Sequence, residues 1–64
     1  MGPLRLITPD QRWRVYASQR RPGFDLVEVW PDRHMQVHLE DATLVEVVAA
    51  MERLGVDPLT LVKA

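Results

Sequence analysis

The sequence predicts an α+β fold, in which a small antiparallel meander of three or four β-strands packs against one C-terminal amphipathic helix, followed by a short helical tail. Two observations favour this fold. In the first half of the chain, short runs of strand-forming residues alternate with turns that contain proline. In the second half, apolar residues recur every three to four positions, which is the spacing of a helix. The chain has 64 residues, and we expect residues 1–64 to form one domain.

Four runs of strand-forming residues are separated by three turn signals. Proline fixes φ for the second position of a turn, and glycine tolerates the positive φ that can follow it. The turns are expected at residues 8–11, 20–23 and 30–33. The strands are expected at residues 4–7, 12–18, 24–30 and 35–39. The first run is either a short edge strand or an extended tail.

The second strand has the clearest alternation in the chain, because charged or aromatic residues alternate with apolar ones at every position. Trp13, Val15 and Ala17 therefore share one face, which we take as the core face. The opposite face of this strand carries Arg12, Arg14 and Tyr16.

The third and fourth strands are expected to be joined by a three-residue loop, because Pro31 cannot adopt the positive φ that a two-residue hairpin turn prefers. This loop pairs Trp30 with His34, Val29 with Met35, Glu28 with Gln36 and Val27 with Val37. A coherent core face would then add Val27, Val29, Met35, Val37 and Leu39. The outer face would carry Arg12, Arg14, Tyr16, Leu26, Glu28, Trp30, His34, Gln36 and His38. A slip of one residue would exchange the two faces, so the register stays open.

A helix is expected over residues 42–54. Its apolar stripe consists of Leu44, Val47, Val48, Met51 and Leu54. Asp41 can cap the start, and Thr43 with Glu46 has the spacing of a capping box. Gly55 suits the position that follows a helix end. Asp57 and Pro58 then start a last helical turn through residues 59–62, whose apolar side chains either fold back over the sheet edge or contribute to an oligomer interface.

Several classes of function are disfavoured by composition. The chain has no cysteine, which excludes disulfides and thiolate metal sites. His34 and His38 would stand roughly 13 Å apart on a strand, too far to share a metal ion. We find no nucleophile motif and no glycine-rich phosphate loop, so we expect neither an enzyme, a cofactor nor a small-molecule substrate. With no membrane-spanning run and no secretory signal, a soluble cytoplasmic protein is expected.

The outer sheet face is the place where the chain is expected to touch a partner. The candidate binding residues are Arg12, Arg14, Tyr16, Arg20, Arg21 and Trp30. One interpretation is a solvated face, on which Glu28 pairs with Arg14 and Trp30 covers the stem of an arginine. Another is an interface with a protein, because Trp, Tyr and Arg are favoured anchors. A third is nucleic-acid binding, in which arginine contacts guanine or phosphate.

The layout of residues 12–54 has a known parallel. A strand, the turn at Arg20-Arg21-Pro22-Gly23-Phe24, two further strands and an amphipathic helix resemble the DNA-binding domains of plant ethylene-response factors and the arm-binding domains of tyrosine integrases. The resemblance implies that the outer sheet face would enter the major groove of DNA. The chain departs from these families in its acidic helix and in its net charge of −1.

Taken together, these patterns predict a small non-enzymatic binding or regulatory module that acts through protein–protein contact. A homodimer is expected, because a cysteine-free domain of this size gains stability by association. The alternative is a DNA-binding module that uses the outer face of the sheet. The first 39 residues carry six arginines against four acidic residues, whereas the remainder holds five acidic residues against two basic ones.

Overall fold

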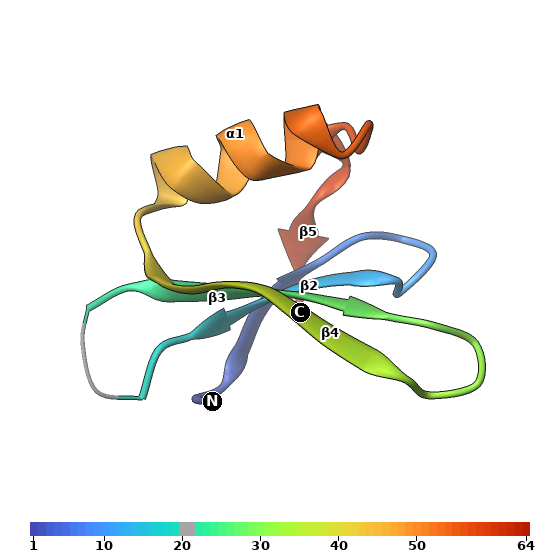
Figure 1. Cartoon of the computed structure of the whole chain (residues 1–64), viewed down its shortest axis with the longest axis horizontal. Helices are drawn as coiled ribbons and strands as arrows, with labels where there is room; N and C mark the ends of the chain where they lie inside the picture. Colours follow the sequence, from blue (N-terminus) through green and yellow to red (C-terminus); the bar gives the residue numbers. More distant parts are fainter. Residues whose placement is uncertain (20–21) are drawn as a thin grey trace.

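The computed structural model describes residues 1–19 and 22–64, and these residues form the expected small α+β domain (Figure 1). Its elements are β1 (Leu4–Ile7), β2 (Trp13–Ala17), β3 (Phe24–Val29), β4 (Met35–Ala42), α1 (Leu44–Arg53), a 3₁₀ turn (Pro58–Thr60) and β5 (Val62–Lys63). Within the described residues the strands form one antiparallel sheet in the order β4-β3-β2-β1-β5. Along the chain, β1 to β4 form the expected meander, and α1 lies across one face of the sheet only (Figure 1).

The core lies between α1 and the face of the sheet that carries Trp13 and Val15. Trp13 lies opposite Glu28 and Val15 lies opposite Leu26 in the β2–β3 pair, so these four side chains point to the same side. The buried core residues are Trp13, Val15, Leu26, Ala42, Val47, Ala50 and Met51, with Leu6, Phe24, Leu39, Val56 and Leu61 packed against them. The core face expected for β2 is therefore confirmed.

The expected hairpin loop between β3 and β4 is confirmed, but the face assigned to that hairpin was wrong. Val29 pairs with Met35, Glu28 with Gln36 and Val27 with Val37, and the Trp30 N–H donates to the His34 carbonyl over 2.8 Å. However, Val27 lies opposite Arg14 of β2 rather than on the side of Trp13. The side chains of Val27, Val29, Met35 and Val37 consequently point away from the helix, whereas Leu26 and Glu28 point toward it.

A β-bulge in β4 separates Leu39 from this group. Leu26 pairs with Leu39, yet the next residue of β3, Val27, pairs with Val37. His38 is therefore the extra residue on β4, and it shifts the alternation by one position. As a result Leu39 packs against the core, as expected, while Val37 two residues earlier lies on the opposite face.

Helix α1 is shorter than expected, and of the two expected caps it uses the capping box at Thr43 rather than Asp41. Thr43 is the N-cap, and its hydroxyl accepts from the Glu46 N–H while the Glu46 carboxylate accepts from the Thr43 N–H, which completes the capping box. Asp41 does not cap the helix, because it belongs to β4 and has a φ of 52°. At the other end Gly55 has a φ of 78°, and the Val56 N–H donates to the Met51 carbonyl as in a Schellman motif.

The expected last helical turn is present as a 3₁₀ turn, but it does not extend through residue 62 as expected. Asp57 caps a 3₁₀ turn at Pro58–Thr60, but the chain then extends and pairs with β1 as β5. Strand β1 thus lies inside the sheet rather than at its edge, and the tail folds back over that edge, one of the two expected outcomes. In the described part of the chain, no helix is long and apolar enough to cross a membrane.

Candidate functional site

The structure brings together three of the six candidate binding residues. Arg12, Arg14 and Trp30 line one hollow at the end of the sheet, between the β1–β2 loop and the β3–β4 loop. Tyr16 lies two residues further along β2 on the same face as Arg14, outside this hollow. The remaining two, Arg20 and Arg21, lie outside the described residues.

We call the side of the sheet opposite α1 the open face, since no element covers it within the described residues (Figure 1). Cross-strand pairing places on it Leu4, Ile7, Arg14, Tyr16, Asp25, Val27, Val29, Met35, Val37 and Val62. Most of these side chains are apolar. Solvated sheet faces usually alternate polar residues with the buried ones behind them, so this composition is unusual for a surface left to water.

Three apolar side chains of the open face are strongly exposed. Met35 exposes 53% of its surface, Val62 exposes 51% and Val37 exposes 42%. Between Val37 and Arg14, in the middle of the sheet, Val27 is completely buried even though it points away from the helix. The open face therefore has a buried apolar centre and exposed apolar residues at both margins, on β4 and on β5.

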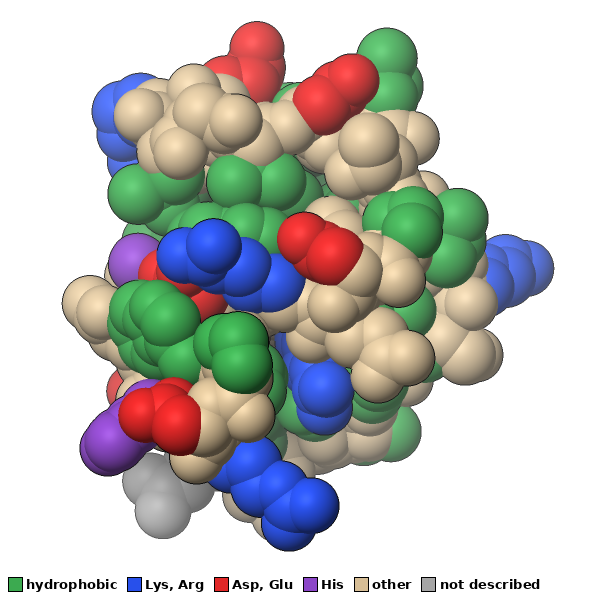
Figure 2. Space-filling model, turned by 90° about the vertical axis from the view of Figure 1, so that its right-hand side faces the viewer, with side chains coloured by type: hydrophobic (Ala, Val, Ile, Leu, Met, Phe, Trp, Pro, Cys, Tyr) green, Lys and Arg blue, Asp and Glu red, His purple; other side chains and the backbone are tan. Residues whose placement is uncertain are grey.

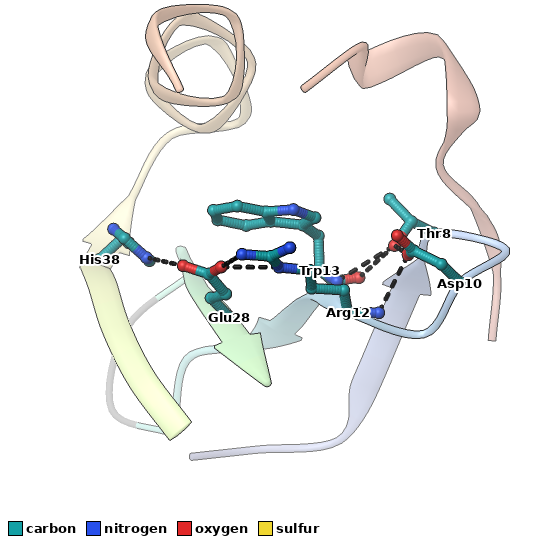
Figure 3. A network of polar contacts seen from close by, with 6 residues as sticks. All are labelled: Thr8, Asp10, Arg12, Trp13, Glu28 and His38. Carbon is teal, nitrogen blue, oxygen red and sulfur yellow. Dashed lines mark hydrogen bonds and ion pairs between the residues drawn. The ribbon is translucent and has the colours of Figure 1, made fainter. Parts of the chain in front are cut away.

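A buried carboxylate on the other side of the sheet fixes Arg12. Glu28 is only 5% exposed, and its Oε2 accepts from Nε of Arg12 over 2.7 Å (Figure 3). Its other oxygen, Oε1, lies 3.0 Å from Nε2 of His38. The expected positions of Glu28 and His38 on the outer face were therefore wrong, and the arginine that pairs with Glu28 is Arg12 rather than Arg14.

This buried cluster connects three strands and the core. The ring of His38 lies 5.2 Å from the ring of Trp13, centroid to centroid, with an angle of 40° between the planes. Across the described residues, no buried side-chain nitrogen or oxygen lacks a hydrogen-bond partner. Because the polar atoms of Glu28 are occupied by protein partners, this cluster has the properties of a structural clamp.

The β1–β2 loop is held by Thr8 and Asp10 (Figure 3). The buried Thr8 hydroxyl donates to Oδ1 of Asp10 over 2.5 Å and accepts from the Trp13 N–H over 3.0 Å. Oδ1 of Asp10 also accepts from the Arg12 N–H over 3.0 Å. The Thr8 hydroxyl and then the Arg12 N–H stabilise the charged form, so the pKa of Asp10 lies below its ordinary value of 3.8. This loop sets the backbone from which Arg12 extends.

The hollow at the end of the sheet has a volume of about 440 Å³. We call it the arginine hollow, and it is lined by Asp10, Gln11, Arg12, Arg14, Val29, Trp30, Pro31 and Arg33. Neither Arg14 nor Arg33 forms an ion pair with any described residue. In the space-filling view of this end of the molecule, basic side chains lie among hydrophobic and acidic ones (Figure 2).

A second, more open hollow adjoins the first at Trp30 and Pro31. It has a volume of about 720 Å³ and is lined by Trp30, Pro31, Asp32, His34, Met35 and Gln36. Here Oδ2 of Asp32 lies 2.6 Å from Nδ1 of His34. Hydrogen bonds from the side chain and then the backbone of His34 lower the pKa of Asp32 below its ordinary value. Val29 lines the first hollow and Met35 lines the second. These two residues pair across the strands on the open face, so both hollows adjoin that face.

Sequence reasoning missed Arg33 as a member of this site. Its signal was its place as the last residue of the β3–β4 loop, where a hairpin of this length often has a left-handed residue. Arg33 has a φ of 72°, and its N–H donates to the Trp30 carbonyl over 2.8 Å. The turn therefore holds the backbone of Arg33 next to Trp30.

No family model, curated protein or solved structure matches the chain, so comparisons with known proteins assign it to no family. In residues 1–19 and 22–64, no group of three or more His, Asp or Glu side chains is arranged to hold a metal ion.

Proposed function

We propose that the protein is a small non-enzymatic binding module that acts through protein–protein contact, with the open face of its sheet as the interface. The observation that carries this proposal is the exposure of Met35 and Val37 on a face that is otherwise mostly apolar. Contiguous exposed apolar surface is costly in water and marks interaction sites on soluble proteins. Arg14 and Tyr16 lie on the same face, and both residue types are common interface anchors.

A second apolar patch lies on the outer side of the helix, but it has less support as an interface. Leu44, Val45, Val48 and Ala49 line it together with Glu52, and Val45 is 78% exposed. This patch contains neither an arginine nor an aromatic residue. It also lies on a single helix, whereas the open face extends over five strands.

The occupant that we propose for the open face is a second copy of the chain. A domain of 64 residues buries a smaller share of its apolar surface than a larger one, so its stability is marginal. The chain has no cysteine with which to form a disulfide, and association is another common source of stability for small domains. Placing two open faces together would remove Met35 and Val37 of both copies from water.

DNA binding by the sheet face, the alternative function, has less support from this geometry. Arg14 is the one basic residue among the described side chains of the open face. Glu28 and His38, which were expected there, lie on the helix side instead. A face dominated by valine, isoleucine and methionine offers few groups that can hydrogen-bond base edges or phosphates.

Sedimentation equilibrium of the wild type and of two isosteric variants tests the proposal. Val37→Thr and Met35→Gln introduce polar atoms at exposed positions and keep side-chain size, so the fold should persist. Each should weaken self-association at least about tenfold, because a polar group without a partner is costly to bury. Val45→Thr is the matched comparison on the helix patch and should leave association unchanged.

Three results would overturn the proposal. The wild type could remain monomeric throughout the micromolar range, the open-face variants could associate like the wild type, or Val45→Thr could be the variant that dissociates. Retention of the wild type on a DNA column that falls steeply with salt would support the alternative, since phosphate contacts release counterions.

A further inference from the structure

We propose that the arginine hollow binds an acidic segment of a partner protein, one that carries carboxylates next to a hydrophobic side chain. This inference rests on the proposed role in protein–protein contact and assigns a second partner to it. The hollow lies at the end of the sheet, where the β1–β2 and β3–β4 loops form most of its wall. It shares Arg14 and Val29 with the open face, so the acidic segment and a second copy of the chain would compete wherever the copy covers these two residues.

The charges of the hollow favour an acidic ligand. Three arginines line it, Arg12, Arg14 and Arg33, against one carboxylate, Asp10. Asp10 is already occupied by the Thr8 hydroxyl and the Arg12 N–H. Arg14 and Arg33 have no carboxylate partner among the described residues. Each guanidinium can bind a carboxylate through two parallel N–H groups, and such pairs are stronger than hydrogen bonds between neutral groups.

Two of the three arginines are held in place before any ligand binds. Nε and Nη2 of Arg12 both contact Oε2 of the buried Glu28, although the side chain of Arg12 remains 49% exposed. Nε of Arg14 donates to the Gln11 carbonyl over 3.0 Å, which leaves its terminal nitrogens available. Groups fixed in this way lose less side-chain entropy when they bind a partner.

The wall of the hollow supplies apolar contacts beside these charges. Trp30 and Pro31 line both the arginine hollow and the adjoining one, which Met35 also lines. A hydrophobic side chain placed next to Trp30 would be removed from water while neighbouring carboxylates reach the arginines. This combination is the reason for proposing an acidic and hydrophobic segment rather than an acidic one alone.

The same surroundings disfavour an extended polyanion. Asp10 lies within the hollow, and Asp32 lines the adjoining one. Acidic and hydrophobic side chains interrupt the basic ones over this end of the molecule (Figure 2). The whole chain carries a net charge of −1. A nucleic-acid backbone contacts proteins along a continuous basic track, whereas a short segment with two or three carboxylates needs only the hollow.

The inference can be tested before the partner is identified. Peptides that bind the full chain are selected from a displayed library of random short peptides. Each selected peptide is then measured against the wild type, the double variant Arg14→Gln/Arg33→Gln and the double variant Arg5→Gln/Arg53→Gln. The second variant removes the same charge at exposed positions outside the hollow. Both variants must show wild-type circular dichroism melts, since both change exposed or half-buried side chains.

We expect the selected peptides to be enriched in Asp and Glu next to a hydrophobic residue. Their affinity should fall at least about tenfold in Arg14→Gln/Arg33→Gln and remain unchanged in Arg5→Gln/Arg53→Gln. Three outcomes would overturn the inference. The first is that no peptide is selected. The second is that the selected peptides lack acidic enrichment or bind both variants equally well. The third is that a duplex oligonucleotide binds more tightly than the peptides through the same arginines. Sedimentation equilibrium of Arg14→Gln/Arg33→Gln, run beside the peptide measurements, reports self-association on its own, so failure of the peptide prediction leaves the proposed open-face dimer standing.

Discussion

Trp13 of β2 lies directly opposite Glu28 of β3, so an indole and a buried carboxylate share the face that packs against the helix. This relationship sets the side-chain directions along β3 and, through the paired residues 35–37, at the start of β4; from His38 onward the bulge changes the alternation. With Glu28 toward the helix, its neighbours Val27 and Val29 must point to the open face. The apolar surface that we propose as an interface therefore exists because a charged residue occupies the core side of β3.

Removal of that carboxylate should destabilise the fold. We predict that Glu28→Gln lowers the free energy of unfolding by about 1–3 kcal/mol, because two charge-assisted hydrogen bonds are replaced by weaker ones at a buried position. The comparison variant is Glu40→Gln, which changes an exposed side chain of the neighbouring strand and should cost no more than about 0.5 kcal/mol. Urea denaturation measures both. Equal stabilities for the two variants would show that the Glu28 clamp contributes nothing.

The helix should lose its packing when its buried face receives a charge. Val47 is completely buried against the sheet, whereas Val45 is 78% exposed on the same helix. We predict that Val47→Asp abolishes the cooperative thermal transition, because burying an unpaired carboxylate costs several kcal/mol, comparable to the stability of a domain of this size. Val45→Asp should melt within a few degrees of the wild type. A cooperative melt for Val47→Asp near the wild-type temperature would mean that a different helix face is buried.

Asp10 should make the β1–β2 loop sensitive to acid. The pKa of Asp10 is lowered by the Thr8 hydroxyl and by the Arg12 N–H, so its stabilising contribution is present above its ordinary value of 3.8 and is lost as the pH falls through the lowered pKa. We predict that Asp10→Asn is less stable than the wild type at neutral pH and that the difference shrinks as the pH drops below 3.8. Denaturant melts at several pH values measure it. A difference that stays constant with pH would contradict this assignment.

Gly23 should tolerate no side chain, because the backbone of β4 passes close to it. A Cβ atom built on Gly23 would lie 2.9 Å from the carbonyl carbon of Asp41 and 3.1 Å from its Cα. The Asp41 backbone is fixed by a hydrogen bond from its N–H to Oδ1 of Asp25, so it cannot move away freely. We predict that Gly23→Ala lowers the free energy of unfolding by more than about 1 kcal/mol. A melting temperature of Gly23→Ala equal to that of the wild type would show that the Asp41 backbone leaves room for a side chain at position 23.

The parts of the fold that sequence could predict are those with local signals. The alternation of residues 12–17 gave the core face of β2, and Pro31 gave the loop length and pairing of the β3–β4 hairpin. The capping box at Thr43 and the C′ residue Gly55 were also readable, since their hydrogen bonds join residues close in sequence.

The face of the β3–β4 hairpin could not be predicted because β3 has no polar side. Asp25, Leu26, Val27 and Glu28 are all buried, so the strand lacks the alternation that identifies a core face. The carboxylates are held by partners distant in sequence, as Glu28 is by Arg12 and His38. The bulge at His38 then reverses the alternation within β4. The periodicity of the sequence does not indicate the position of this bulge.

The candidate site was predictable in its residue types rather than in its shape. Arg12, Arg14 and Trp30 do line one hollow, but they meet at the ends of two hairpins and not on a single flat face. Their meeting depends on the β2–β3 register, which brings the β1–β2 loop beside the β3–β4 loop. Arg33 joins them because of the left-handed conformation at the end of its loop.

Intermolecular contacts across the open face can be observed by nuclear magnetic resonance in a sample that mixes isotopically labelled and unlabelled chains at millimolar concentration. Nuclear Overhauser effects filtered for contacts between the two kinds of chain should involve the methyl groups of Met35 and Val37. The same experiment on Val37→Thr should lose these signals. Intermolecular signals confined to Leu44 and Val45 of the helix, or a complete absence of such signals, would contradict the assignment of the open face as the interface.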